Sequence, residues 1–172
     1  MIPTLETERL ILRAPEASDF LVYRDFFADA DASRFYGGPM DASAAWRVLA
    51  ADLGHWVLRG YGRWAVVERA SGRMIGGCGL WWAEGWPRSE LTWWIVPAAR
   101  RMGYAAEASR AAIAFGYRTL GWDVVETHMN DANLAARRLA EKLGGRIAAR
   151  ELFPDGLERD IYALPRSEER ER

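Results

Sequence analysis

The residues best suited to chemistry form a short basic loop, Arg100-Arg101-Met102-Gly103-Tyr104-Ala105. An apolar run at 91–96 before the loop predicts a strand, and an Ala-rich segment after it predicts a helix to about residue 120. The first amides of a helix lack intrahelical partners and carry partial positive charge, so a loop that opens a helix suits an anion. Gly103 lets the backbone approach a phosphate, and the two arginines add charge. The loop therefore indicates a pyrophosphate site, with a turn carrying two solvated arginines as the alternative.

A second candidate is Asn133, which directly precedes a predicted amphipathic helix at 134–143. Gly144 and Gly145 end that helix. The Asn133 side chain can cap that helix.

The basic loop resembles the acyl-CoA loop of the GNAT superfamily of N-acetyltransferases. The resemblance is carried by R-x-x-G-x-A after W-W-I-V-P, with E-A following it. The segment 121–144, with Asn133 and a closing E-K-L-G, resembles the second signature of that superfamily. This resemblance implies that Asn133 bonds the pantetheine arm; its amide has both donors and an acceptor for that role, which is compatible with capping the helix. The run E-L-T-W-W-I-V-P and the opening T-x-R-L-x-L-R are similar to its ribosomal-protein N-acetyltransferase branch. The resemblance spans about residues 4–164.

This resemblance implies an N-acetyltransferase that moves an acetyl group from acetyl-CoA to a primary amine. Acetyl-CoA would enter where two parallel strands splay apart, and its pantetheine arm would pair with the backbone of Trp94 and Val96. A backbone N–H, such as that of Trp94, would donate to the oxyanion. The expected cofactor-binding residues are Trp94, Ile95, Val96, Arg100, Arg101, Met102, Gly103, Tyr104, Ala105 and Asn133.

The amine must be neutral to attack, so a base with a raised pKa is needed, and a partly desolvated carboxylate fits that need. The resemblance places Glu90 beside the thioester, which makes Glu90 the first candidate; Glu84, on the preceding connection, is the second. His128 falls on the second parallel strand and is expected to be non-catalytic.

The expected general acid is missing from the helix at 134–143. Many members of the superfamily use a tyrosine there, whereas this chain has Leu139 and Ala140. Ala136 stands where a serine is usual. The sequence does not allow Tyr104 or Tyr117 to be assigned as the acid.

The predicted order of elements is a strand, two helices, three strands, a helix, a strand, a helix and two strands. Hairpin connections make most neighbours antiparallel, and only the strands joined by the central helix run parallel. We therefore expect an α/β (α+β) fold, with a mixed, mostly antiparallel sheet of six or seven strands and helices on both faces. Residues 1–164 would form a single domain, followed by a disordered charged tail at 165–172. The strands are expected at 8–14, 63–69, 73–82, 91–96, 124–129, 146–152 and 158–163, and the helices at 18–27, 42–59, 104–120 and 134–143.

The helix at 42–59 is expected to bury Trp46, Leu49, Leu53, Trp56 and Val57, with His55 on the surface. The loop at 31–40 contains Phe35, Tyr36, Gly37, Gly38 and Pro39. Its aromatic residues are candidates to line an acceptor entrance, or else form a hydrophobic plug. The cluster Trp81, Trp82, Trp86, Trp93 and Trp94 similarly predicts either core packing or an aromatic acceptor pocket.

Composition narrows the function classes. The chain has 172 residues and a net charge of −1, which gives no electrostatic case for nucleic acid or membrane binding. The lone Cys78 is expected to fill core space, and together with the absence of a secretory leader it favours the cytoplasm. We expect no metal, and an acceptor that is a small-molecule or peptide amine. The sequence leaves monomer and homodimer open.

Two other functions remain possible at this level. A non-catalytic acyl-CoA-binding sensor or regulatory module is favoured by the missing tyrosine and serine. A nucleotide-binding domain of another kind is disfavoured, because the loop lacks three glycines and most of the sheet is antiparallel.

Overall fold

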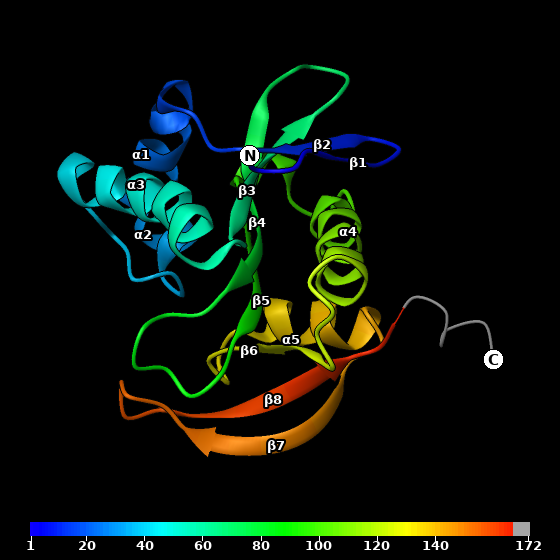
Figure 1. The fold of residues 1–172 in the computed structure, drawn as a ribbon. Coiled ribbons are helices and arrows are strands. Elements are labelled where there is room, and N and C mark those ends of the chain that lie inside the picture. The colour runs from blue at the N-terminus through cyan, green and yellow to red at the C-terminus, as the bar shows by residue number, and fades with distance from the viewer. Residues whose placement is uncertain (167–172) are drawn as a thin grey trace.

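The computed structural model describes residues 1–166, and Figure 1 shows the arrangement of its elements. Most of the expected elements are confirmed, and the expected bounds of 42–59 and 146–152 are matched by α3 and β7. The two-residue β1 and the short α2 were not expected. Of the charged tail expected at 165–172, residues 167–172 lie outside the described part of the chain. The elements are β1 (Leu5–Glu6), β2 (Leu10–Arg13), η1 (Ala17–Asp19), α1 (Phe20–Ala28), α2 (Ala30–Ser33), α3 (Ala42–Arg59), β3 (Arg63–Glu68), β4 (Met74–Trp81), β5 (Glu90–Ile95), η2 (Pro97–Ala99), α4 (Tyr104–Arg118), β6 (Val125–His128), α5 (Leu134–Lys142), β7 (Arg146–Leu152) and β8 (Glu158–Leu164).

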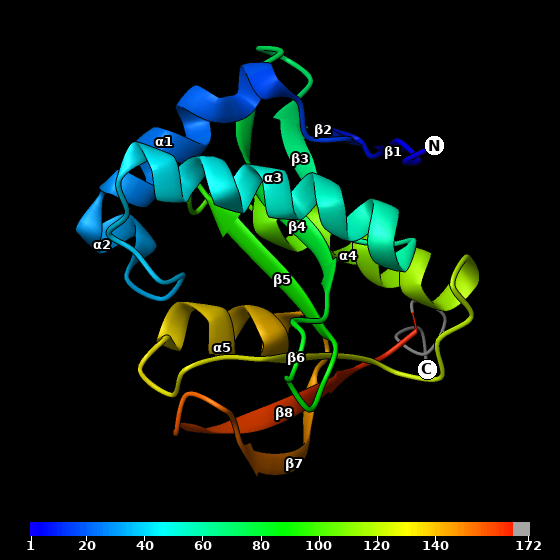
Figure 2. The same ribbon diagram turned by 60° about the vertical axis from the view of Figure 1, so that its left-hand side comes forward.

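The strands form two hydrogen-bonded sheets rather than the single sheet that was expected. Five antiparallel strands follow the order β1-β2-β3-β4-β5, and three more follow the order β6-β8-β7. Strands β5 and β6 meet where the Thr127 hydroxyl donates to the Leu91 carbonyl at 2.8 Å. They run in the same general direction and diverge toward their carboxyl ends, where α5 lies below β5 (Figure 2). The α/β class with mostly antiparallel pairing is therefore confirmed, and the expected separation of the two parallel strands is present.

Helices cover both faces of the larger sheet (Figure 1). Alternate residues of a strand point to opposite faces, and β3 shows this clearly. Trp64 and Val66 pack in the cluster that contains α4, whereas Ala65 and Val67 pack with α1 and α3. Cys78 is fully buried in the α4 cluster and its pKa is raised to about 12 by burial, so its expected role as core filler is confirmed.

Helix α3 differs from its prediction in the face that it buries. Its buried residues are Ala45, Leu49, Asp52, His55 and Trp56, whereas Trp46, Leu53 and Val57 stay exposed. The expected surface position of His55 was wrong. The reason is that the left-handed Gly60 turns the chain back, so that His55 Nδ1 lies 2.6 Å from the Tyr61 carbonyl and Nε2 accepts from the Trp82 amide at 3.2 Å.

Candidate active site

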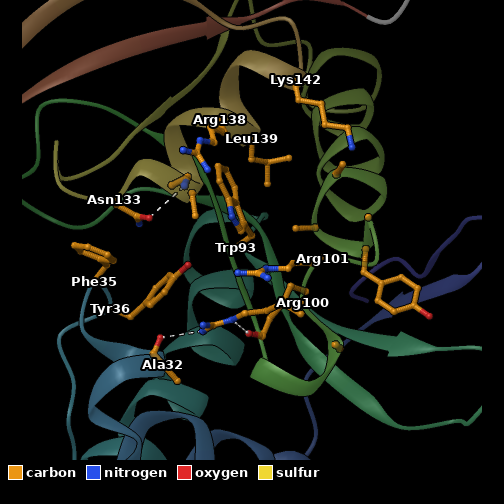
Figure 3. Close-up of a pocket in the computed structure, with 18 of the residues that line it drawn as sticks. Ala32, Phe35, Tyr36, Trp93, Arg100, Arg101, Asn133, Arg138, Leu139 and Lys142 are labelled. Carbon is orange, nitrogen blue, oxygen red and sulfur yellow. Dashed lines mark hydrogen bonds between the residues drawn. The ribbon is translucent and has the colours of Figure 1, made fainter.

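Two cavities open around the gap between β5 and β6. The first has a volume of about 580 Å³ and lies between the end of β5, the start of α4, one face of α5 and the 31–36 segment (Figure 3). The second, of about 420 Å³, lies beside the first residues of β5, the last residues of β6 and the residues that follow β6. The residues that line both are Arg34, Phe35, Tyr36, Trp93, Asn133 and Ala136, so the two cavities meet at these side chains.

The start of α4 forms one wall of the first cavity. Gly103 is the N-cap with φ +83°, and Tyr104, Ala105 and Ala106 also line the wall. Amides in a first helical turn have no intrahelical acceptor, so this wall presents free donors and the positive end of the helix dipole. Arg9, which sequence reasoning missed, holds the loop by donating to the Met102 carbonyl at 2.8 Å and to Glu107 at 2.7 Å.

The cations around this cavity divide into two groups. The Arg100 guanidinium donates to the carbonyls of Ile95 at 3.0 Å and Ala32 at 3.2 Å, so it ties the loop to its neighbours. Arg101, with Arg138 and Lys142 on α5, is exposed at the cavity. Figure 3 shows these three side chains around the opening. The α5 cations were missed because their place opposite α4 depends on the fold; their i, i+4 spacing was the only signal.

The β5 residues whose backbone groups face the gap differ by one position from those that were expected. The Val96 amide donates to the Ile75 carbonyl at 2.9 Å, and its carbonyl accepts from Ala99 at 2.9 Å. The expected pairing of Val96 with a pantetheine arm was therefore wrong. Since backbone groups alternate in direction along a strand, Trp94 also faces β4, in register with Gly77.

Trp93 and Ile95 instead turn backbone groups toward the gap. The Leu91 carbonyl, on the same side of the strand, already accepts there from the Thr127 hydroxyl. The Trp94 side chain is fully buried against α1, between Tyr23 and Phe26. The expectation that the Trp94 amide is the oxyanion donor fails for the same reason.

The other expected cofactor residues divide by position. Ile95, Arg100, Arg101, Gly103, Tyr104, Ala105 and Asn133 line the first cavity, whereas Trp94, Val96 and Met102 do not. Asn133 caps α5, because its side-chain oxygen accepts from the Ala136 amide at 3.2 Å. Its side chain also borders both cavities, so the two predicted roles are compatible in the fold.

Glu90 lies at the wall of the second cavity, at the first residue of β5. Burial raises the pKa of its carboxyl to about 7, while the nearby Arg63 and Arg159 act in the opposite direction. His128 Nε2 lies 3.6 Å from Glu90 Oε2. Burial and Arg159 lower the pKa of His128 to about 4, so the imidazole is neutral at pH 7. Glu84, the second candidate, is 95% exposed and pairs with Arg59 at 2.7 Å, outside both cavities.

The two arginines near Glu90 are held by other carboxylates. Arg63 pairs with the fully buried Asp52 at 2.5 Å, and Arg159 makes two bonds to Asp155 at 2.8 and 2.5 Å. Within each pair, the charges of the arginine and the carboxylate largely neutralise each other. Sequence reasoning missed both arginines, because they come from β3 and β8, far apart in the chain.

Aromatic side chains form much of the remaining wall. Trp81, Trp86 and Trp93 line the second cavity, together with Phe27 and Phe35. Trp94 belongs to the core, and Trp82 lies at the surface with its indole N–H donating to the Trp86 carbonyl at 2.8 Å. The tryptophan cluster is therefore divided between the core, the cavity wall and the surface, and an acceptor pocket remains a prediction.

Residues 9–146 match the family model of the acetyltransferase (GNAT) domain. The chain belongs to the GNAT acetyltransferase family. An uncharacterised N-acetyltransferase, YoaA, of Bacillus subtilis (strain 168) is 29% identical over 149 residues, which cover 84% of this chain and 83% of that protein. The crystal structure of an acetyltransferase from Agrobacterium tumefaciens strain C58 has a TM-score of 0.87 and 32% identity, with 96% of this chain and 95% of that chain covered.

A more distant likeness concerns the fold alone. The structure of a ribosomal L7/L12 alpha-N-protein acetyltransferase in complex with coenzyme A has a TM-score of 0.76 at 13% identity, with 96% of this chain and 99% of that chain covered. The family match and the two nearer relatives make this GNAT acetyltransferase an acyl-transferring enzyme, of a family whose acetyl donor is acetyl-CoA.

Within residues 1–166, no helix is long and apolar enough to cross a bilayer. In that same range, no group of three or more His, Cys, Asp and Glu side chains is arranged to hold a metal ion.

Proposed function

We propose that this GNAT acetyltransferase moves an acetyl group from acetyl-CoA to the primary amine of a compact acceptor, with Glu90 as the base. The observation that carries this proposal is the continuity of the two cavities. One begins at the helix terminus of α4, the other contains a carboxyl whose pKa is about 7, and they meet at Trp93 and Tyr36.

The first cavity suits the phosphates and pantetheine arm of acetyl-CoA. The free amides at the start of α4 and the cations Arg101, Arg138 and Lys142 favour phosphate oxygens. Beyond them, the gap-facing Ile95 amide and Trp93 carbonyl offer a donor and an acceptor to an amide-containing arm, whereas the Ile95 carbonyl is already bound by Arg100. Asn133 adds a side-chain amide on the opposite wall.

The second cavity suits the amine and its deprotonation. A carboxylate with a pKa near 7 is well matched to accept a proton at neutral pH, directly or through a water. Neutral His128, 3.6 Å from that carboxylate, does not repel an incoming ammonium group. A gap-facing amide of β5, such as that of Trp93, is suited to stabilise the negative charge that develops on the acetyl oxygen.

Charge in the second cavity favours an acceptor with no more than one positive charge. Its lining includes Glu90 and Asp155 against Arg34, Arg63 and Arg159. Asp155 is already bound on both oxygens by Arg159, which leaves Glu90 for the amine. A polyamine or aminoglycoside would bring several ammonium groups to a wall in which Glu90 is the one lining carboxylate, among the described residues, that no arginine binds. The aromatic walls suit instead an amine with an apolar or aromatic body, or the N-terminus of a short peptide.

The test combines binding with turnover. Isothermal titration should show acetyl-CoA binding, and a thiol-detecting assay should show CoA release with tyramine, phenethylamine or a dipeptide. Spermidine and kanamycin should be acetylated with kcat/KM at least about tenfold lower, as expected for one unfavourable charge contact of about 1.4 kcal/mol. The double variant Arg138→Gln, Lys142→Gln should weaken acetyl-CoA binding, and the double variant Arg47→Gln, Arg110→Gln, at two exposed positions outside both cavities, is the matched control.

The outcomes separate the candidates. Absence of acetyl-CoA binding would contradict the proposal altogether. Binding without CoA release on the whole amine panel would favour the sensor module. Preferred acetylation of spermidine or kanamycin would contradict the acceptor class and leave the reaction in place.

A further inference from the structure

The CoA thiolate that leaves in the reaction must be protonated, and α5 supplies no side chain for this step. As the carbon–sulfur bond breaks, its electron pair passes to sulfur, and a proton must reach that thiolate. The donor has to lie where the two cavities meet, because sulfur lies between the pantetheine arm and the acetyl carbon. Of the six described residues that line both cavities, Phe35 and Ala136 have no polar side-chain proton.

The other four differ sharply in what they can donate. The Arg34 guanidinium stays charged and is largely exposed, and the amide of Asn133 and the indole of Trp93 do not release protons near neutral pH. Tyr36 has the remaining hydroxyl. Figure 3 shows this hydroxyl directed into the cavity, toward the side of Asn133 and Trp93.

The chain fixes Tyr36 in this position through the connection between α1 and α3. The Tyr36 amide donates to the Ser33 carbonyl at 2.8 Å, and its ring packs edge-on against Phe26 at 5.6 Å. The Ser33 hydroxyl in turn donates to the Asp29 carbonyl at 2.7 Å. A Cβ on Gly38 would lie 1.9 Å from Ser33 Oγ, so the loop closes tightly over this contact. These bonds give the phenol a defined direction.

Other tyrosines near the site have different partners. The Tyr104 hydroxyl donates to Glu68 at the end of β3, and Tyr104 does not line the second cavity. The Tyr117 hydroxyl donates to the Leu164 carbonyl and accepts from the Val125 amide, and Tyr117 lines neither cavity. Burial raises the pKa of Tyr36 to about 12, although the nearby Arg100 and Arg63 act in the opposite direction, so its phenol keeps its proton at neutral pH.

We infer that the Tyr36 hydroxyl is the general acid that protonates the departing CoA thiolate. This inference rests on the proposed function. The amine nitrogen forms its bond to the acetyl carbon and gives up a proton to Glu90. The carbon–sulfur bond then breaks, the electron pair goes to sulfur, and the Tyr36 proton follows it. The phenolate recovers a proton from solvent, and Glu90 releases one, so the products are the amide and neutral CoA thiol.

The experiment measures single-turnover rates with saturating acetyl-CoA and tyramine. Tyr36→Phe should lower the rate about 100-fold while leaving the Kd for acetyl-CoA unchanged, because it removes one proton and keeps the ring. Tyr61→Phe, whose ring lines neither cavity, is the matched control and should keep the wild-type rate. Thermal unfolding of both variants verifies that each remains folded.

A second series separates proton donation from packing. Mono-, di- and trifluorotyrosine placed at position 36 lower the phenol pKa stepwise with little change in shape. The logarithm of the single-turnover rate should change linearly with the phenol pKa. A flat series, or a Tyr36→Phe rate equal to that of the wild type, would overturn the inference. If the wild-type protein releases no CoA with any amine, the proposed function itself fails and the two results are distinguished.

Discussion

At the scale of single residues, Glu90 combines a function with a cost in stability. Burial holds its pKa near 7 instead of the ordinary 4.5. The folded protein therefore keeps a proton that the unfolded chain releases between these pH values, so folding becomes less favourable as pH rises from about 4.5 to about 7. Arg63 and Arg159 limit this effect without forming direct pairs with the carboxylate, because Asp52 and Asp155 bind them. The residue is thus left ionisable in the range where a base is useful.

Replacing Glu90 with Gln should affect activity and stability in opposite directions. The wild-type rate should rise with pH through about 7, because only the carboxylate accepts a proton. Glu90→Gln should lose this rise and lower kcat about 100-fold or more. At pH 8 the same variant should be more stable to urea by about 1–3 kcal/mol, since no charge is buried.

The control for this experiment is Glu84→Gln, at an exposed carboxylate. It should keep the pH profile and the urea midpoint of the wild type. An unchanged pH dependence in Glu90→Gln would show that another group, or the amine itself, controls the titration.

At the scale of elements, the start of α4 depends on one backbone conformation. Gly103 has φ +83°, a region in which a side chain is strained, and a Cβ there would lie 3.3 Å from Arg9 Nη2. Arg9 in turn shapes the loop through Met102 and Glu107. The conformation of the loop and the direction of its free amides are therefore set together.

Gly103→Ala should destabilise the protein by about 1 kcal/mol and weaken acetyl-CoA binding at least about tenfold. The matched change is Gly54→Ala, in α3, where an added Cβ meets nothing within 4 Å. Because alanine is the better helix former, Gly54→Ala should stabilise the protein by about 0.5–1 kcal/mol and leave binding unchanged. Calorimetry and titration measure both effects. Equal acetyl-CoA affinity in the two variants would argue against a phosphate site at this terminus.

At the scale of the whole molecule, the site depends on two sheets that touch at one end and separate at the other. The Thr127–Leu91 bond lies at the closed end, where both residues are buried. Beyond it, β5 and β6 are not paired by backbone hydrogen bonds among the described residues. Trp93 packs there against residues of α5. The opening is therefore a property of the relation between the sheets.

Thr127→Val keeps the shape of the side chain but leaves the Leu91 carbonyl without its donor. Such a loss in a buried position should cost about 1–3 kcal/mol of stability. It should also raise KM for acetyl-CoA, since the walls of the gap are less firmly held. Thr119→Val, at the exposed end of α4, is the comparison and should change neither quantity. A Thr127→Val protein with wild-type stability would mean that this bond does not hold the sheets together.

The sequence by itself determined the elements, the position of the basic loop and the candidate base. These are local properties: apolar periodicity, Gly and Pro at element ends, and a motif contiguous in the chain. Glu90, Gly103 and Asn133 were found in this way, and all three line the cavities.

Only the tertiary structure decided which backbone groups of β5 face the gap, because a shift of one residue reverses their direction. It also decided that His55 is buried, and that Arg9, Lys142 and Tyr36 surround the site. These residues come from separate elements, and what brings them together is the packing of two sheets and their helices, which no single stretch of sequence encodes.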